Sequence, residues 1–357
     1  MKIAILWSSL TNYSVAFFKE LALQGCNIQL IYQPNKSEAP YQAFDLSFCE
    51  VALEDSEDVK VNLEQLMQSF NPAFILMSSW GFPHFMKLTR KLRKKGIYVI
   101  ASMDNQWNCT YKQHLGVISS KLFLKPSIDT LFVAGDRQAY FARKLGFYNV
   151  LHGLYAADIN QFACTVPIWQ RPENFLFIGR LVSVKGVEEL ARAYEAYREQ
   201  VNKPWGLKVA GIGPLAKLLS GVPGVDLFGF VQPAHLPELM KEARCFILPS
   251  RWEPWGVVIH EAAAAGLPII ATYPCGATTM FVRDGVNGFV VPPKRHQLTK
   301  AMVRISTAPQ TVLERMSISS STLAHMWNPA RLAEYFIDSI SAIRTLKTSG
   351  NRFYTPK

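Results

Sequence analysis

Two basic residues follow a short apolar stretch near the middle of the chain. Residues 175–186 read FLFIGRLVSVKG, in which an apolar strand runs into Gly179 and Arg180 and then reaches Lys185. Backbone N–H groups at the start of a helix attract anions, and fixed cations nearby strengthen such a site. Arg180 can grip two oxygens of a diphosphate, while Lys185 acts as a point charge. The alternative is a solvated Arg and Lys at an ordinary strand–helix turn.

Two carboxylates, Glu253 and Glu261, follow another apolar strand. Residues 249–268 read PSRWEPWGVVIHEAAAAGLP, so a helix is predicted to open near Gly256 and Val257. Free amides at that point can receive a phosphate, while the carboxylates accept hydrogen bonds from sugar hydroxyls. In the alternative interpretation, Glu253 only complements the helix dipole and Glu261 is solvated. The run of alanines after Glu261 predicts close packing, and a buried carboxylate needs a partner.

Two further strand ends are weaker signals. Gly211 and Gly213 end one strand in a Gly-x-Gly, which allows the backbone to approach a ligand closely. The G-x-G-x-x-G of dinucleotide-binding folds is not completed, so such a turn also suits packing alone. Phe230 and Val231 end the next strand, where the backbone can read a nucleobase edge or simply pack in the core.

Short apolar runs alternate with longer amphipathic segments, which predicts parallel sheets built from βαβ units. Ligands of such sheets bind beyond the carboxyl ends of the strands. The alternation pauses at Asp158–Glu173, the best linker candidate. The predicted strands are Ile3–Trp7, Ile28–Tyr32, Phe74–Met77, Tyr98–Ala101, Thr130–Val133, Phe175–Ile178, Leu207–Ala210, Val225–Phe228, Cys245–Leu248, Ile269–Ala271 and Gly288–Val291. The predicted helices are Tyr13–Gln24, His84–Lys95, Gln138–Leu145, Lys185–Gln200, Leu236–Ala243, Val257–Ala265 and Pro329–Ile343.

Taken together, these motifs resemble the donor domain of the family 4 retaining glycosyltransferases, which have the GT-B fold and a group 1 glycosyl transferase domain. The resemblance is carried by GRLxxxKG, GxGPL, FGFV, PSxxEPxGxxxxEA and DGxNGFVVPP, in this order over residues 179–293. It implies two Rossmann-like, doubly wound domains facing across a cleft. We expect residues 1–160 on the acceptor side and residues 161–335 as the donor domain. Residues 336–357 would form a helix and basic tail returning toward the first domain.

The resemblance also implies roles for particular residues. Arg180 and Lys185 would hold the donor diphosphate and Glu253 the hydroxyls of the transferred sugar. The remaining donor contacts would come from Gly179, Gly213, Phe230, Val231, Trp255, Gly256, Val257 and, at the ribose, Glu261. It further implies a nucleotide-diphosphate sugar as co-substrate, retention of configuration and no cofactor or metal. The sequence has no Asp-x-Asp motif and no cluster with metal-ligand spacing.

The first half departs from the family pattern. The loop Ser8–Ser14 lacks the glycine pair that is common there, and Ser102–Trp107 reads SMDNQW where many members have a histidine near the reacting sugar. Asp104 is our candidate to replace that histidine as a hydrogen-bond acceptor. An Asp-Asn pair is as often only a turn. Met280 lies four residues before the DGxNGFVVPP motif, at a position where many members have an acidic residue.

A basic segment suggests an anionic partner. The chain has a formal net charge of +11, and residues 84–126 hold nine Lys and Arg against a single acid, Asp104. The predicted helix His84–Lys95 has an apolar stripe of Phe85, Leu88 and Leu92. Such a helix suits an anionic bilayer surface or, alternatively, packs on the sheet. The predicted membrane contacts are Lys87, Arg90, Lys91, Arg93, Lys94 and Lys95.

Composition limits the class of protein. A chain of 357 residues with 49% hydrophobic residues predicts about two globular domains and excludes a mainly disordered protein. The apolar start is too short for a secretory signal, and the six cysteines are scattered, so we expect a cytoplasmic protein, with peripheral contact to the cytoplasmic face of the membrane. We expect sugar transfer to a glycan or lipid-linked acceptor, in polysaccharide or glycolipid assembly. The alternatives are a non-catalytic GT-B partner subunit and, with no recognition motif to support it, a nucleic-acid-binding protein.

Overall fold

The chain folds into two compact units, which are described separately. The structure is a computed structural model, and it describes residues 1–33, 43–53 and 57–348. Unit 1 consists of Met1–Ala156 together with the chain from Pro329 onward, and unit 2 of Ala157–Asn328. The predicted tail beyond residue 348 lies outside the described residues. In the described part of the chain, no helix is both long enough and apolar enough to span a membrane.

A parallel sheet forms the centre of unit 1. Its order, over the described residues, is β3-β2-β1-β4-β5-β6-β7, and every neighbouring pair is parallel. Strands β2 and β3 extend the sheet on one side of β1, and β4 to β7 extend it on the other side. The bounds are β1 (Lys2–Trp7), β2 (Asn27–Tyr32), β3 (Glu50–Leu53), β4 (Phe74–Met77), β5 (Tyr98–Met103), β6 (Thr130–Val133) and β7 (Val150–His152).

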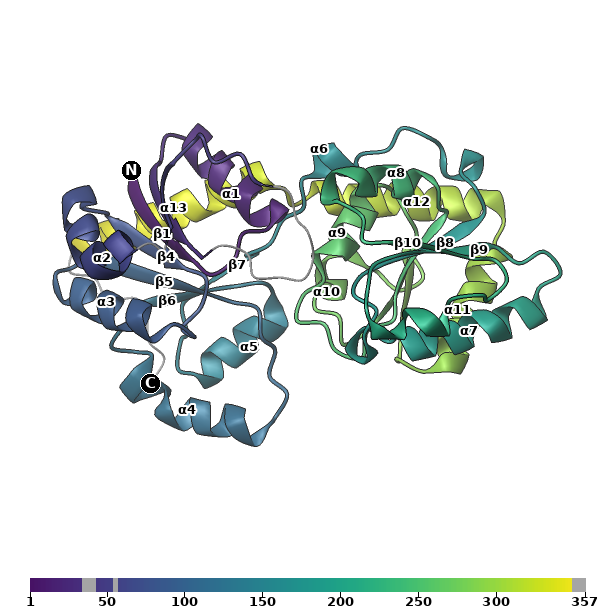
Figure 1. The fold of residues 1–357 in the computed structure, drawn as a ribbon, viewed down its shortest axis with the longest axis horizontal. Coiled ribbons are helices and arrows are strands. Elements are labelled where there is room, and N and C mark those ends of the chain that lie inside the picture. The colour runs from purple at the N-terminus through teal and green to yellow at the C-terminus, as the bar shows by residue number, and fades with distance from the viewer. Residues whose placement is uncertain (34–42, 54–56, 349–357) are drawn as a thin grey trace. The chain divides into compact units, whose positions relative to one another are not determined.

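Helices cover both faces of this sheet, as its buried strands require. They are α1 (Asn12–Leu23), α2 (Glu57–Phe70), α3 (Pro83–Lys94), α4 (Tyr111–Phe123), α5 (Asp136–Lys144) and α13 (Pro329–Thr348). Helix α13 returns from the end of the chain to lie along α1 (Figure 1). The ring of Phe336 lies 5.6 Å from that of Phe17 and 5.4 Å from that of Phe132. The last helix is therefore part of the core of unit 1.

Unit 2 is built around a second parallel sheet, ordered β10-β9-β8-β11-β12-β13 over the described residues. Helices α7 and α11 lie on one face of the sheet and α9 and α12 on the other (Figure 1). The strands are β8 (Asn174–Ile178), β9 (Gly206–Ala210), β10 (Val225–Gly229), β11 (Cys245–Leu248), β12 (Ile269–Thr272) and β13 (Gly288–Val291). The helices are α6 (Ile159–Phe162), α7 (Val187–Gln200), α8 (Leu236–Lys241), α9 (Val257–Ala264), α10 (Thr278–Phe281), α11 (Arg295–Ser306) and α12 (Gln310–His325).

The predicted fold class is confirmed, with two doubly wound parallel sheets. Each predicted strand is present, and the sequence pattern missed β3 and β7. Strand β3 is mostly exposed at the sheet edge, so it has no apolar run, and β7 has only three residues. The segment expected to be a linker packs inside unit 2, where Asp158 caps α6 and Ile168 and Arg171 are buried.

Candidate functional site

The motifs of the second half meet at one edge of the unit 2 sheet. Because all its strands are parallel, the segments that follow β8, β9, β10 and β11 leave from the same edge. From β8 the chain adds β9 and β10 on one side of the sheet and then β11 on the other side, so the strand order reverses between β8 and β11. We call this place the switch point of the unit 2 sheet. Ligands of open α/β sheets bind at such a point. Residues 179–186 and 249–256 leave the sheet on either side of it.

The segments after β8 and β11 are held together by their backbones. Gly186 has φ +72°, and a Cβ there would lie 2.1 Å from the carbonyl oxygen of Pro249. The amides of Arg251 and Trp252 both donate to the carbonyl of Val184, at 2.9 and 3.3 Å. The glycine is therefore required both by its dihedral angle and by the close approach of the second segment.

This backbone contact brings Lys185 and Glu253 together. Their side chains form an ion pair, although the two residues are 68 positions apart in the sequence. The Glu253 side chain is 11% exposed and that of Lys185 is 18% exposed. The buried hydroxyl of Ser250 donates to the same carboxylate oxygen at 3.5 Å. A carboxylate and an ammonium thus stand side by side between the segments that follow β8 and β11.

Arg180 and Arg251 lie on the same side of the sheet but differ in their partners. Arg251 is held by Glu189 at 2.6 Å and by the hydroxyl of Ser183. Arg180 is exposed, and no carboxylate among residues 1–33, 43–53 and 57–348 pairs with it. Arg180 is therefore the guanidinium that is available to an incoming anion at this edge.

The start of α9 is fixed against the same carboxylate. Gly256 has φ +90°, and a Cβ there would lie 3.0 Å from Cγ of Glu253. The buried Trp255 accepts a backbone hydrogen bond from Ala277 at 2.8 Å, which braces the turn from the segment after β12. The first amides of a helix have no partner within the helix, so those from Val257 onward face the end of this turn.

Helix α9 also carries two neighbouring titratable residues. Burial raises the pKa of the partly exposed Glu261 carboxyl to about 7. His260 is fully buried, and burial lowers its pKa to about 4. Ala157 N–H donates to Nδ1 of His260, so Nε2 carries the proton and donates to the carbonyl of Ala324, each at 3.0 Å. The imidazole is thus a neutral structural group, and the ligand contact of Glu261 stays a prediction.

The Gly-x-Gly after β9 serves packing in this structure. A Cβ on Gly211 would lie 1.9 Å from the carbonyl oxygen of Gly179, and one on Gly213 would lie 2.4 Å from that of Leu181. Both glycines therefore let the segment after β9 lie against the segment after β8. A donor contact for Gly213 stays a prediction.

Phe230 follows β10, and it is partly exposed like Val231 beside it. Because β10 and β11 belong to one parallel sheet, both residues lie at the same sheet edge as Glu253. A nucleobase contact for them stays a prediction.

Asp104 lies in unit 1, directly after β5. The Tyr155 hydroxyl donates to its carboxylate at 3.2 Å, and the ring of Tyr13 lies 5.1 Å from the ring of Tyr155. Burial and the adjacent carboxylate raise the pKa of Tyr155. No sequence pattern indicated this partner, because only the sheet brings the segments after β5 and β7 together. A role for Asp104 in the reaction stays a prediction.

The apolar stripe of the basic helix is buried. Phe85, Leu88 and Leu92 of α3 lie in the core of unit 1 and are at most 5% exposed. The prediction that this stripe faces a bilayer is therefore wrong, and the alternative of packing on the sheet holds. Lys91 pairs with Glu64 at 2.7 Å and Arg93 with Asp129 at 2.8 Å. Of the six residues predicted to contact a membrane, five are exposed, namely Lys87, Arg90, Lys91, Lys94 and Lys95.

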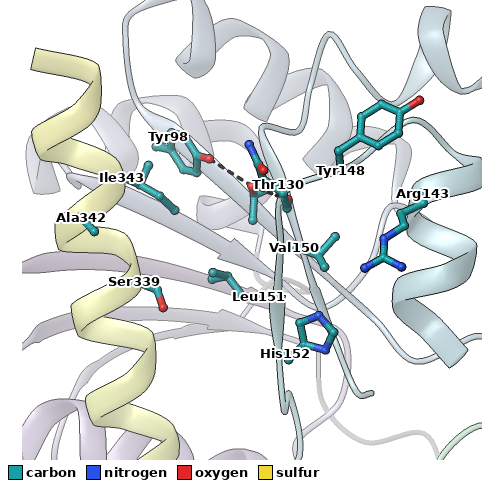
Figure 2. Close-up of a pocket in the computed structure, with 11 residues that line it drawn as sticks. Tyr98, Thr130, Arg143, Tyr148, Val150, Leu151, His152, Ser339, Ala342 and Ile343 are labelled. Atoms are coloured by element: carbon teal, nitrogen blue, oxygen red, sulfur yellow. Dashed lines mark hydrogen bonds between the residues drawn. The ribbon is translucent and has the colours of Figure 1, made fainter. Parts of the chain in front are cut away.

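A separate cavity of about 380 Å³ lies in unit 1, beside α13. Figure 2 shows Ser339, Ala342 and Ile343 of α13 facing strand residues, with a hydrogen bond between Tyr98 and Thr130. Tyr98 and Thr130 are the first residues of their strands, so this cavity adjoins the amino ends of β5 and β6. It is thus not at the strand ends where an α/β sheet binds its ligand.

The described side chains include no group of three or more His, Cys, Asp or Glu able to hold a metal ion.

Comparison with known proteins finds a family model that matches part of unit 2. Residues 172–308 match the family model described as glycosyl transferases group 1. An uncharacterized glycosyltransferase of Methanocaldococcus jannaschii is 34% identical over 140 residues, which is 37% of this chain and 35% of that protein. The chain thus spans about a third of the length of that relative.

Solved structures extend the likeness to nearly the whole chain. The sucrose-phosphate synthase from Thermosynechococcus elongatus superposes with a TM-score of 0.74 at 16% identity, covering 98% of this chain and 100% of that one. The Anabaena protein HepE, solved in complex with UDP and glucose, gives a TM-score of 0.70 at 15% identity, covering 96% and 100%. Identities this low establish the fold, and the fold is that of the GT-B glycosyltransferases.

Proposed function

We propose that the chain transfers a sugar from a nucleotide-diphosphate donor to an acceptor, and the premise is the match of residues 172–308 to the family model of group 1 glycosyl transferases. The observation that carries the proposal is the Lys185–Glu253 pair at the switch point of the unit 2 sheet. The UDP and glucose bound by the similarly folded HepE support a nucleotide-sugar donor. The proposal names the class of donor, a nucleotide-diphosphate sugar, and does not name the sugar.

The donor diphosphate is proposed to lie on Arg180 and Lys185. Arg180 has no paired carboxylate in the described part of the chain, so its guanidinium can take two phosphate oxygens. The Lys185 ammonium has three donors, so it can hold Glu253 and a phosphate oxygen together. The amides at the start of α9 add to the positive potential at this point.

Glu253 is proposed to orient the transferred sugar. Its carboxylate is buried and faces Lys185 next to the Gly256 turn, so sugar hydroxyls that donate to it would hold the anomeric carbon near the diphosphate. Glu261 would accept from the ribose hydroxyls, Trp255 and Val257 would contact the sugar and phosphate, and Phe230 and Val231 would meet the base.

The difficult step is cleavage of the anomeric C–O bond, because negative charge grows on the leaving diphosphate. Cations that are fixed near those oxygens stabilise the transition state more than the ground state. Attack by the acceptor from the same face would give retention, without a metal ion to carry the charge. We propose Asp104 of unit 1 as an acceptor-side hydrogen-bond partner, which would be held by the Tyr155 hydroxyl.

The proposed acceptor is a glycan or a lipid-linked glycan in polysaccharide or glycolipid assembly. The exposed cations of unit 1 support an anionic membrane surface as the place of reaction, with the protein bound peripherally.

A panel of nucleotide sugars, screened by thermal denaturation, tests the donor site. A donor that binds the native state raises the melting temperature, and each donor that does so is then assayed for hydrolysis and transfer. Stabilisation by one class of nucleotide sugar, with turnover, is the expected result. Stabilisation with no turnover would favour a non-catalytic partner subunit, and stabilisation by oligonucleotides alone would contradict the proposal.

A further inference from the structure

Helix α4 of unit 1 presents its large apolar side chains to solvent. Tyr111 is 77% exposed, Leu115 47%, Ile118 75% and Leu122 70%. Their spacing of four, three and four residues places them within roughly 60° of arc on a helix. We call these four residues the apolar stripe of α4. Single exposed apolar residues are common on protein surfaces, but a contiguous row of four is the mark of an interaction surface.

The face of α4 that packs on unit 1 carries Val117, which lies against the hydrophobic core, and the small polar Ser120. Ser120 is buried, and its hydroxyl donates to the carbonyl of Leu145 at 3.0 Å. At the start of the helix, Thr110 and Gln113 form a capping box, and the Gln113 side chain donates to the carbonyl of Gln106 at 2.7 Å. These contacts fix the rotation of the helix about its axis, so the apolar stripe points away from the protein.

The charges around the stripe are all of one sign. Lys112 and Lys121 lie about 90° to either side of it on the helix, and both are exposed. Neither has an ion pair within the described residues, and residues 105–128 contain no Asp or Glu. Flanking lysines keep their ammonium groups in water while their stems lie along an apolar surface.

The basic end of α3 adjoins the segment that follows α4. Arg93 donates to the carbonyl of Lys125 at 2.6 Å, which ties the last turn of α3 to the residues after α4. The exposed Lys94 and Lys95 therefore extend the positive surface beyond the C-terminal end of α4. This combination of an outward apolar row and exposed cations is complementary to an anionic lipid surface.

We propose that α4 is the membrane-docking element of the protein, lying in the interface of an anionic bilayer with its apolar stripe among the acyl chains. The inference deepens the membrane association under the proposed function, and it does not depend on the transfer chemistry. It also gives the two helices different tasks. Helix α4 inserts side chains, while α3, whose apolar stripe is buried, contributes charge alone.

Sedimentation of the full chain with lipid vesicles tests the inference. The vesicles are phosphatidylcholine alone and phosphatidylcholine mixed with phosphatidylglycerol. The docking variant is Ile118→Gln with Leu122→Gln, and the matched control is Ile318→Gln in unit 2, whose side chain is 67% exposed. A third variant, Lys87→Glu with Arg90→Glu, removes charge from α3. Circular dichroism confirms that each variant is folded.

We expect the natural chain to bind the anionic vesicles and to be released by salt. The docking variant should bind at least about tenfold more weakly, because two apolar side chains no longer leave water on docking. The control should bind like the natural chain, and the α3 variant should lose less binding than the docking variant.

Three results would overturn the inference. If the docking variant binds normally and the α3 variant does not bind, the protein associates with membranes through α3 and not through α4. No binding by any form would remove the membrane association as well, while donor stabilisation would still report on the transfer proposal. Self-association that the docking variant abolishes, without vesicle binding, would assign the stripe to a second copy of the chain.

Discussion

At the scale of single residues, the proposed chemistry depends on a carboxylate and an ammonium that the chain keeps next to each other. Sequence motifs identified Lys185 and Glu253 individually, and the structure adds their ion pair. No local pattern could predict that pair, because the residues lie 68 positions apart and meet only when β11 takes its place beside β8. The hydroxyl of the buried Ser250 also contacts this carboxylate, and a serine three residues before a glutamate carries no sequence signal for such a contact.

Glu253→Gln should reduce sugar transfer by about a hundredfold or more, because the change removes a charge aimed at the reacting sugar and keeps the shape of the side chain. We expect a small loss of stability, about 1 kcal/mol, since Lys185 is 18% exposed and can turn to water. Steady-state kinetics and urea denaturation measure the two effects. Glu238→Gln on the surface helix α8 is the control. Near-normal transfer by Glu253→Gln would remove Glu253 from the mechanism.

At the scale of elements, the sequence predicted what is locally encoded. Runs of buried apolar residues located the central strands, whereas the exposed β3 and the three-residue β7 have no such signal. The basic helix α3 shows a second limit of prediction from a local pattern. Its sequence fits both a membrane and a core, and only the tertiary structure reveals that the stripe of α3 is buried while that of α4 is exposed.

The contact between the segments after β8 and β11 can be tested at Gly186. Gly186→Ala should destabilise the protein by several kcal/mol, because the new Cβ would meet the Pro249 carbonyl oxygen in addition to the strained dihedral angle. Gly221→Ala is a matched control: Gly221 has φ +76°, and a Cβ added there would have nothing within 4 Å, so only the dihedral strain of about 1 kcal/mol remains. Urea denaturation of both variants measures the difference, and equal losses would show that the close approach is unimportant.

At the scale of the whole molecule, His260 connects the places where the chain enters and leaves unit 2. Its ring joins the backbone of Ala157 to that of Ala324 and stacks on Phe281 at 3.8 Å. The ring must be neutral to accept from Ala157. A histidine whose pKa is lowered from 6.5 to about 4 binds its proton more weakly in the folded chain than in the unfolded chain. Its contribution to stability is therefore lost as the pH falls from about 6.5 to about 4.

Because of this histidine, we expect the free energy of unfolding to fall by about 3 kcal/mol when the pH is lowered through that range. Glu261 acts in the opposite direction. Its pKa is raised from 4.5 to about 7, so protonation over that range favours the folded state, and its partial exposure reduces the effect. His260→Asn should therefore weaken the loss of stability at low pH, and Glu261→Gln should steepen it. Urea denaturation between pH 4 and pH 7 measures both slopes, and slopes that change in the same direction would contradict this assignment.

The central claim is that the unit 2 switch point binds the diphosphate of a nucleotide sugar, and calorimetric titration with the matching nucleoside diphosphate tests it most directly. The variants are Arg180→Gln and, as a control with the same loss of charge in the same unit, Arg192→Gln on the exposed face of α7. We expect one site per natural chain, binding at least about tenfold weaker in Arg180→Gln, and no change in Arg192→Gln. Equal affinity in all three proteins would contradict the claim.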